Sequence, residues 1–327
     1  MSVIGNTKKQ NSLLKGCAVL LMSGLLIAVT FGTCPGVPQD QETFASPDEA
    51  VKALVDALKA FDTKALSAIF GPGSKDVISS GDPTADKTER ERFINLYTQK
   101  SKLEEADANK VVLYVGNEEW PFAIPIVKKE GAWRFGTDEG REEIFARRIG
   151  RNELSVIQIC LAYVDAQREY ALKDPDSDAL LAYAQKFVSD SGKKDGLYWK
   201  AKEGDEQSPL GPLVAAAQEQ GYTGRQSGDQ PVPYHGYYYR ILKAQGKNAR
   251  GGSYDYVIKG KMIGGFALVA YPARYESSGI MAFIVNHDGV VYEKDLGENS
   301  KKAALAMKLF NPDSTWEKVE EDVAKAK

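Results

Sequence analysis

Histidine and cysteine are scarce in this chain of 327 residues, and their scarcity limits the chemistry that it can carry out. The two histidines, His235 and His287, have no metal-ligand spacing, and the three cysteines form no CxxC pair. Zinc sites draw their ligands mainly from these residue types, and the GxSxG elbow of many serine hydrolases is absent. We therefore expect no metal and no other cofactor. The question of enzymatic activity stays open, but the composition favours a non-enzymatic role.

An excess of basic residues is also missing, since the net charge is -3. Lys8, Lys9 and Lys15 are the charged residues of positions 1–33, so the remainder is more acidic than the whole. Such a charge gives no electrostatic reason to bind DNA or RNA. We expect no nucleic-acid partner.

The first 33 residues have the pattern of a secretory signal. A basic stretch precedes an uncharged, leucine-rich run at residues 16–33, and the first acid is Asp40. The export machinery recognises this order of segments. We expect cleavage, a tether at residues 34–45 and a periplasmic or secreted protein. An uncleaved membrane anchor and lipidation at Cys34 are the alternatives.

Residues 46–145 are predicted to form an α+β domain. Ser46 and Pro47 predict the start of one helix, Asp62 caps a second, and a third spans residues 85–100. Period-two patterns then predict a strand at 111–115 and a hairpin formed by 122–127 and 132–135. By analogy, such a layer of helices on a small antiparallel sheet is typical of domains of the nuclear-transport-factor type.

Residues 146–235 are predicted to be helical and then rich in loops. A helix is expected over residues 138–172 with a break at Gly150, followed by one that carries Leu180 to Phe187. Residues 189–233 are rich in Gly, Asp, Lys and Pro, with a helical island at 213–220. A long loop segment inside a globular protein is usually functional or flexible.

Residues 236–327 are predicted to form an antiparallel β-meander with a final helix. The helix is expected at 301–309, and Asn286 to Gly289 have the composition of a hairpin turn. The sheet is similar, by analogy, to those of pilin-like proteins. The predicted strands are residues 236–242, 254–259, 266–271, 280–285 and 290–294.

Aromatic residues in and beside the loop segment are the best candidates for a binding site. Rings on loops can stack on sugars or apolar ligands, although the same rings could simply anchor the loop to the core. The candidate binding residues are Tyr198, Trp199, Tyr234, His235 and Tyr238. No catalytic residue is predicted.

Three other clusters favour structural interpretations. Asp174, Asp176 and Asp178 resemble the start of a calcium loop, but Ala179 and Gln185 occupy its glycine and glutamate positions. We therefore expect helix capping. Cys160 shares a helical face with apolar residues, which indicates a buried thiol. The arginines at 147, 148 and 151 are expected to pair with neighbouring glutamates at 142, 143 and 153.

Six ordered segments resemble one bacterial family, the domain of unknown function numbered 2950. The resemblance covers roughly residues 45–320 and implies an exported protein without an assigned activity and without catalytic residues to transfer. The segments are RRIGRNEL (147–154), DGLYW (195–199), SPLGPL (208–213), GYYYRIL (236–242), GGFALVAYPARY (264–275) and DGVVYEKDLG (288–297).

The function that these observations favour is a non-enzymatic envelope module that binds a protein, a glycan or a small ligand. One alternative is a carboxylate-dependent hydrolase of envelope glycan or peptide, which requires two acids within about 10 Å. Asp195, Glu203, Asp205 and Glu206 are acids of the loop segment, although charged residues are ordinary in loops. Another is an accessory component of a pilus or secretion assembly, which rests on the sheet analogy alone.

Overall fold

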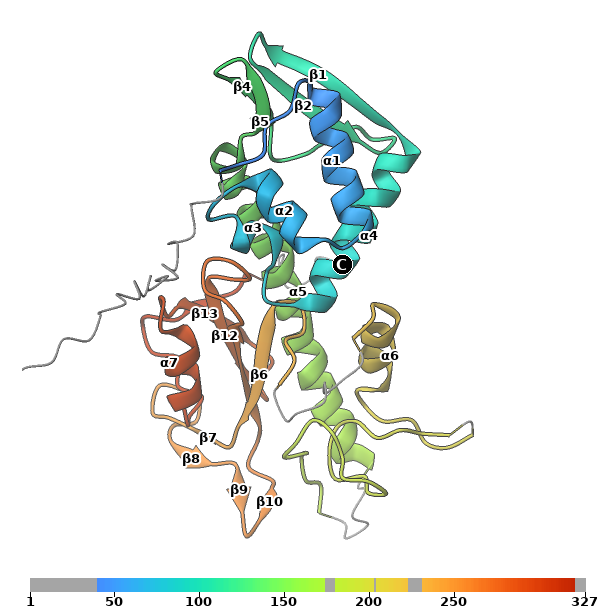
Figure 1. The fold of residues 1–327 in the computed structure, drawn as a ribbon. Helices are drawn as coiled ribbons and strands as arrows, with labels where there is room; N and C mark the ends of the chain where they lie inside the picture. Colours follow the sequence, from blue (N-terminus) through green and yellow to red (C-terminus); the bar gives the residue numbers. More distant parts are fainter. Residues whose placement is uncertain (1–39, 174–179, 203, 223–230, 321–327) are drawn as a thin grey trace, which may run out of the picture. The chain divides into compact units, whose positions relative to one another are not determined.

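A computed structural model describes residues 40–173, 180–202, 204–222 and 231–320 (Figure 1). Helices α1 (Pro47–Lys59), α2 (Thr63–Phe70), α3 (Lys75–Ile78) and α4 (Pro83–Gln99) come first. Ser46 Oγ accepts from Glu49 N, and Glu49 Oε2 accepts from Ala45 N, so Ser46 caps α1 and Glu49 reaches back to the residue before the cap, a variant of the capping box. Asp62 caps α2 as expected. Asp82 caps α4, which therefore begins two residues earlier than the predicted third helix.

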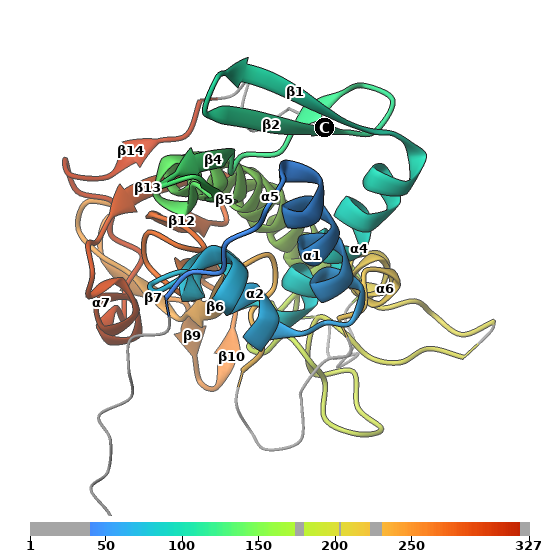
Figure 2. The ribbon, with the colours of Figure 1, turned by 45° about the horizontal axis from the view of Figure 1, so that its top comes forward.

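The first sheet is antiparallel and packs against these helices. It contains β1 (Ser101–Asp107), β2 (Lys110–Val115), β3 (Trp120–Pro121), β4 (Ile126–Lys129) and β5 (Ala132–Phe135). The order is β1-β2-β4-β5, with β3 also paired to β2. Helices α1 and α4 lie side by side, and both contact the sheet (Figure 2). Leu54, Ile69 and Phe135 are among the buried residues of this first core.

Helix α5 (Thr137–Lys173) runs without interruption, so the predicted break at Gly150 is wrong. An interior glycine costs only about 1 kcal/mol, and no neighbour lies within 4 Å of the position where a Cβ would stand. Packing along the 37 residues of the helix outweighs this local preference.

The predicted helix from Leu180 to Phe187 is also wrong, because the described part of this segment, residues 180–188, is irregular. The buried amide of Gln167 explains why. Its Nε2 donates to Ala184 O and its Oε1 accepts from Ala184 N, both at 2.8 Å, as a neighbouring strand would. Tyr183 N also donates to Met262 O. The helical island is confirmed as α6 (Gly211–Glu219).

The second sheet has the order β14-β13-β12-β11-β6, which confirms the meander. Its strands are β6 (Tyr237–Leu242), β11 (Ala267–Pro272), β12 (Met281–Asn286), β13 (Val291–Asp295) and β14 (Glu317–Lys318). The segment expected as one strand at 254–259 is divided between two small hairpins outside this sheet. These hairpins are β7 (Ala244–Gln245) with β8 (Tyr254–Asp255), and β9 (Val257–Ile258) with β10 (Lys261–Met262).

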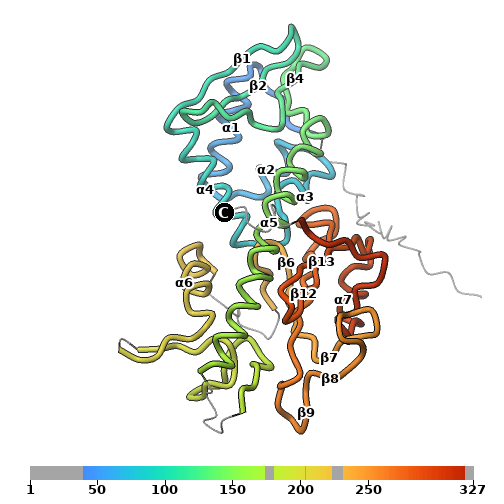
Figure 3. Tube along the Cα trace, turned by 180° about the vertical axis from the view of Figure 1, so that it is seen from behind, coloured from blue at the N-terminus to red at the C-terminus, as the bar shows by residue number. Residues whose placement is uncertain are grey.

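Helices cover both faces of the second sheet. Helix α5 contacts β11, β12 and β13, and α7 (Ser300–Ala306) contacts β11 from the other side (Figures 1 and 3). Strands β11 and β12 are accordingly almost wholly buried. Helix α7 ends three residues before the predicted 309, because Met307 is extended. The fold is mixed α+β, with most helices in the N-terminal half and an antiparallel sheet in the C-terminal half. None of the helices in the described ranges combines the length and apolarity that a membrane span requires.

Candidate functional site

Residues 188–202 fold back on themselves and, with Asp205 and Glu206, line an open cavity of about 570 Å³. Ser189 N donates to Tyr198 O, and Tyr198 N donates to Phe187 O, both at 2.8 Å. These bonds align the two arms of the loop, and Tyr198 and Trp199 line the cavity between them. The structure therefore places two of the five predicted binding residues at a concave surface, the usual form of a ligand site.

Trp199 belongs to both the cavity and the core. It is only 8% exposed, and its Nε1 donates to Glu206 O at 3.1 Å. Lys194 Nζ lies 5.3 Å from the ring centroid and 2.7 Å from Glu206 Oε2. Lys194 therefore rests on the indole and is held there by Glu206.

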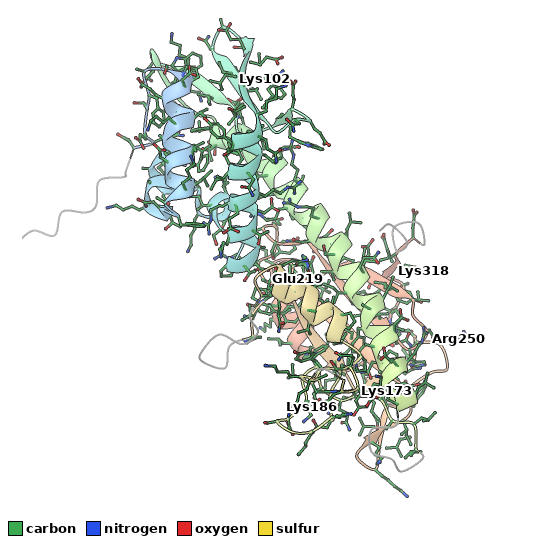
Figure 4. The ribbon with its side chains drawn as sticks, turned by 90° about the vertical axis from the view of Figure 1, so that its right-hand side faces the viewer. Lys102, Lys173, Lys186, Glu219, Arg250 and Lys318 are labelled. Carbon is green, nitrogen blue, oxygen red and sulfur yellow. The ribbon has the colours of Figure 1, made fainter. Side chains whose placement is uncertain are left out.

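The charges that line this cavity are balanced. Its lining includes three lysines and three carboxylates: Lys193, Lys194, Lys200, Asp190, Asp205 and Glu206. Hydrogen bonds from Lys194 and then Lys173 lower the pKa of Glu206, so this carboxyl is ionised at neutral pH. Lys173, at the end of α5, and Lys186 both carry ion pairs to this loop (Figure 4).

Tyr234 and His235 form a separate cluster at the start of β6. Tyr234 and Tyr237 exchange both backbone hydrogen bonds, so His235 and Gly236 are the central residues of a tight turn. Both have positive φ, at 49° and 73°, as a type I′ turn requires. The His235 ring packs against Tyr234, with centroids 4.4 Å apart, and against Tyr222.

Asp82 organises this cluster, although nothing in the sequence except its place before Pro83 singles it out. Its side chain is fully buried, and its Oδ1 accepts from Thr84 N and Ala85 N. Its Oδ2 accepts from the Tyr222 hydroxyl at 2.8 Å and from Gly236 N at 3.0 Å. The carboxylate thus joins the first turn of α4 to the turn before β6.

Burial and the charge of Asp82 shift the pKa values of Tyr222 and His235, and both side chains are neutral at neutral pH. Burial and the adjacent Asp82 raise the pKa of Tyr222. Burial lowers the pKa of His235, and the charge of Asp82 opposes that effect only in part. The imidazole is therefore uncharged at neutral pH.

Tyr238 lies in a third environment. Its ring packs at a tilt against Tyr271 of β11, with centroids 5.6 Å apart, and Lys301 of α7 lies over it. The five predicted residues thus fall into three groups: Tyr198 with Trp199, Tyr234 with His235, and Tyr238 alone.

The arginine prediction is confirmed in one case of three. Arg147 pairs with Glu143 at 2.6 Å, but Arg151 pairs with Glu89 of α4. Arg148 donates to the carbonyls of Asp76, Val77 and Ser277. Glu153 instead accepts from the Tyr237 hydroxyl and from the backbone of Ile280 and Met281, as a sheet anchor.

Cys160 is fully buried as predicted, and burial raises the pKa of its thiol to about 12. Asp174, Asp176, Asp178 and Glu203 lie outside the described residues. Within the described ranges, His, Cys, Asp and Glu form no group of three or more that could hold a metal ion.

Comparisons with curated proteins and with solved structures find no match. A family model does match, over residues 41–319, and its description is "Protein of unknown function (DUF2950)". The match spans both sheets and all seven helices named above. The chain belongs to the DUF2950 family.

Proposed function

We propose that this protein is exported and acts as a binding module of the bacterial envelope, with the cavity at residues 188–206 as its ligand site. The observation that carries the proposal is the cavity itself, which has an aromatic wall of Tyr198 and Trp199. Its volume of about 570 Å³ lies within the range of small-ligand sites.

The chemistry of the lining favours an uncharged, hydroxyl-rich ligand such as a short glycan. Equal numbers of lysines and carboxylates give no preference for an ion of either sign. The same groups, with Ser189 and Ser191, supply donors and acceptors for hydroxyl groups. Aromatic rings contact the apolar faces of sugars, and Lys194 must leave the indole for such a contact to form.

The hydrolase alternative is less well supported by this cavity. A glycosidase needs one carboxyl with a raised pKa to act as an acid. The pKa of Glu206 is instead lowered by lysines. Glu293, whose pKa is raised, is not among the lining residues.

The proposal is tested by titrating the folded protein with a neutral oligosaccharide, chitotetraose, while following tryptophan fluorescence. We expect a change in emission that Trp199→Phe removes, because the indole forms part of the wall. Trp120→Phe is the matched control, since Trp120 is 53% exposed and lies outside the cavity lining. Replacing the indole by the smaller phenyl ring should also weaken binding by up to about tenfold, which calorimetric titration of Trp199→Phe measures independently of emission. Equal responses from both folded variants would refute this location for the site.

A further inference from the structure

Strand β6 forms one edge of the second sheet, with β11 as its neighbour there. The central residues of β6 are half-buried, whereas every residue of β11 is buried. One side of β6 therefore lacks a partner strand in the described sheet. Such edges are ready templates for another extended chain.

The register shows which backbone groups point outward. Ala273 N donates to Gly236 O, so the carbonyl of Gly236 points toward β11. Backbone groups alternate in direction along a strand, and Tyr238, Arg240 and Leu242 therefore also face β11. Tyr239 and Ile241 direct their N–H and C=O groups to the opposite side.

The outward-facing backbone groups at both ends of β6 have hydrogen-bond partners, whereas those in the middle of the strand have none among the described residues. Tyr237 bonds to Tyr234, and Lys243 O accepts from Tyr256 N. Between them, the N–H and C=O groups of Tyr239 and Ile241 have no hydrogen-bond partner among the described residues. The preceding arm does not supply one, because Val232, which the turn would place opposite Tyr239, makes no bond to it.

We propose that the free edge of β6 binds an extended peptide segment of a partner protein by β-strand addition. The alternating donors and acceptors of Tyr239 and Ile241 match a peptide backbone, which a glycan does not reproduce. This proposal is independent of the cavity at residues 188–206, because none of the β6 residues lines that cavity.

The side chains beside the edge define the peptide. On the α7 side, Arg240 donates to the carbonyls of Ala304 and Met307, and Lys301 lies over Tyr238. Neither cation has an ion pair with a carboxylate in the part of the chain that the structure describes. On the α5 side, the half-buried side chains of Tyr239 and Ile241 pack against the second core, so an apolar residue of the peptide would continue that packing at the edge. A strand that alternates acidic and apolar residues satisfies both sides.

The first experiment measures amide hydrogen exchange in the full-length protein without any ligand. We expect the amides of Tyr239 and Ile241 to exchange about 100-fold faster than those of Tyr238 and Arg240, which bond to β11. Equal protection of all four would mean that the chain itself covers the edge, and would overturn the proposal.

The second experiment adds a blocked hexapeptide of alternating valine and glutamate. We expect it to slow exchange at Tyr239 and Ile241 by about tenfold, while the valine–lysine hexapeptide has little effect. Protection that depends on protein concentration, without peptide, would indicate pairing with a second copy and overturn the proposal. So would equal protection by both peptides, or by neither.

A variant tests the backbone requirement directly. Ile241→Pro removes an outward N–H, a change that edge strands tolerate, and should abolish binding of the valine–glutamate peptide. Ile241→Val keeps the N–H and is the matched control, with binding unchanged. Folding of both is checked by thermal melting. If Ile241→Pro fails to fold, the exchange measurements on the unmodified protein decide the matter alone.

Discussion

The hydroxyl of Tyr222 donates a 2.8 Å hydrogen bond to Oδ2 of Asp82, a residue 140 positions earlier in the chain. Asp82 is fully buried and Tyr222 is 9% exposed, so water does not replace this bond if it is lost. The pair links the helix-rich half to the segment that precedes the second sheet.

Tyr222→Phe should therefore lower the free energy of unfolding by about 1–3 kcal/mol, because the buried Asp82 oxygen loses a donor. Chemical denaturation measures this difference. Tyr254→Phe is the control, since the Tyr254 hydroxyl has no hydrogen bond among the described residues, and it should change stability by less than about 0.5 kcal/mol. A loss equal to that of the control would show that the Asp82 bond contributes nothing.

Glu293→Gln should stabilise the protein at neutral pH. Burial, and then the negative charges of Glu153 and Glu317, raise the pKa of Glu293. A raised carboxyl pKa means that the folded state binds this proton more tightly than the unfolded state. Ionisation therefore costs stability as the pH rises above the unfolded pKa of 4.5.

The advantage of Glu293→Gln in melting temperature should accordingly be present at pH 7 and shrink below about pH 4.5. Glu105→Gln, on the mostly exposed strand β1, is the matched control for the loss of one carboxylate. A Glu293→Gln advantage that stays constant between pH 3 and pH 7 would argue against a raised pKa.

Cys160 should resist alkylation by iodoacetamide at pH 8 in the folded protein and react once the protein is denatured. Its thiol is fully buried, and its pKa of about 12 leaves almost no thiolate at that pH. Mass spectrometry of the peptide that contains Cys160 measures the extent of modification. Rapid modification without denaturant would show that the core around α5 opens readily.

The natively expressed protein should begin between about Thr33 and Gln41 and be found outside the cytoplasm. N-terminal sequencing and intact mass measure the start, and fractionation gives the compartment. A full-length chain in the cytosol would contradict export. A full-length chain in the membrane fraction would favour the uncleaved anchor.

Local signals predicted the elements that local chemistry determines. Ser46 and Pro47 marked the start of α1, and Asn286 to Gly289 marked the β12–β13 turn, where Gly289 N donates to Asn286 O. Strand β1 escaped prediction because its residues are mostly exposed and charged, which leaves no alternating pattern. The irregular structure of residues 180–188 was not predicted because its backbone bonds to distant groups: Gln167 pairs with Ala184, and Tyr183 N donates to Met262 O.

The candidate site was predictable only in part, because some of its contacts join residues that lie far apart in the sequence. Aromatic residues on a loop identified Tyr198 and Trp199, and the structure places both at a cavity. The role of Asp82 could not be predicted, because it depends on a turn 154 residues away at Gly236. The free edge of β6 is likewise a property of the strand order rather than of the residues in it.

Helix α5 contributes to both hydrophobic cores, and this sharing has a consequence for folding. Ile144 and Phe145 pack on the first core, whereas Ile157, Cys160 and Tyr163 are buried in the second. Neither core can open fully without fraying a helix that the other one holds. Cooperativity should therefore extend through the helix backbone, so that calorimetry records one transition and local opening begins in segments that α5 does not touch.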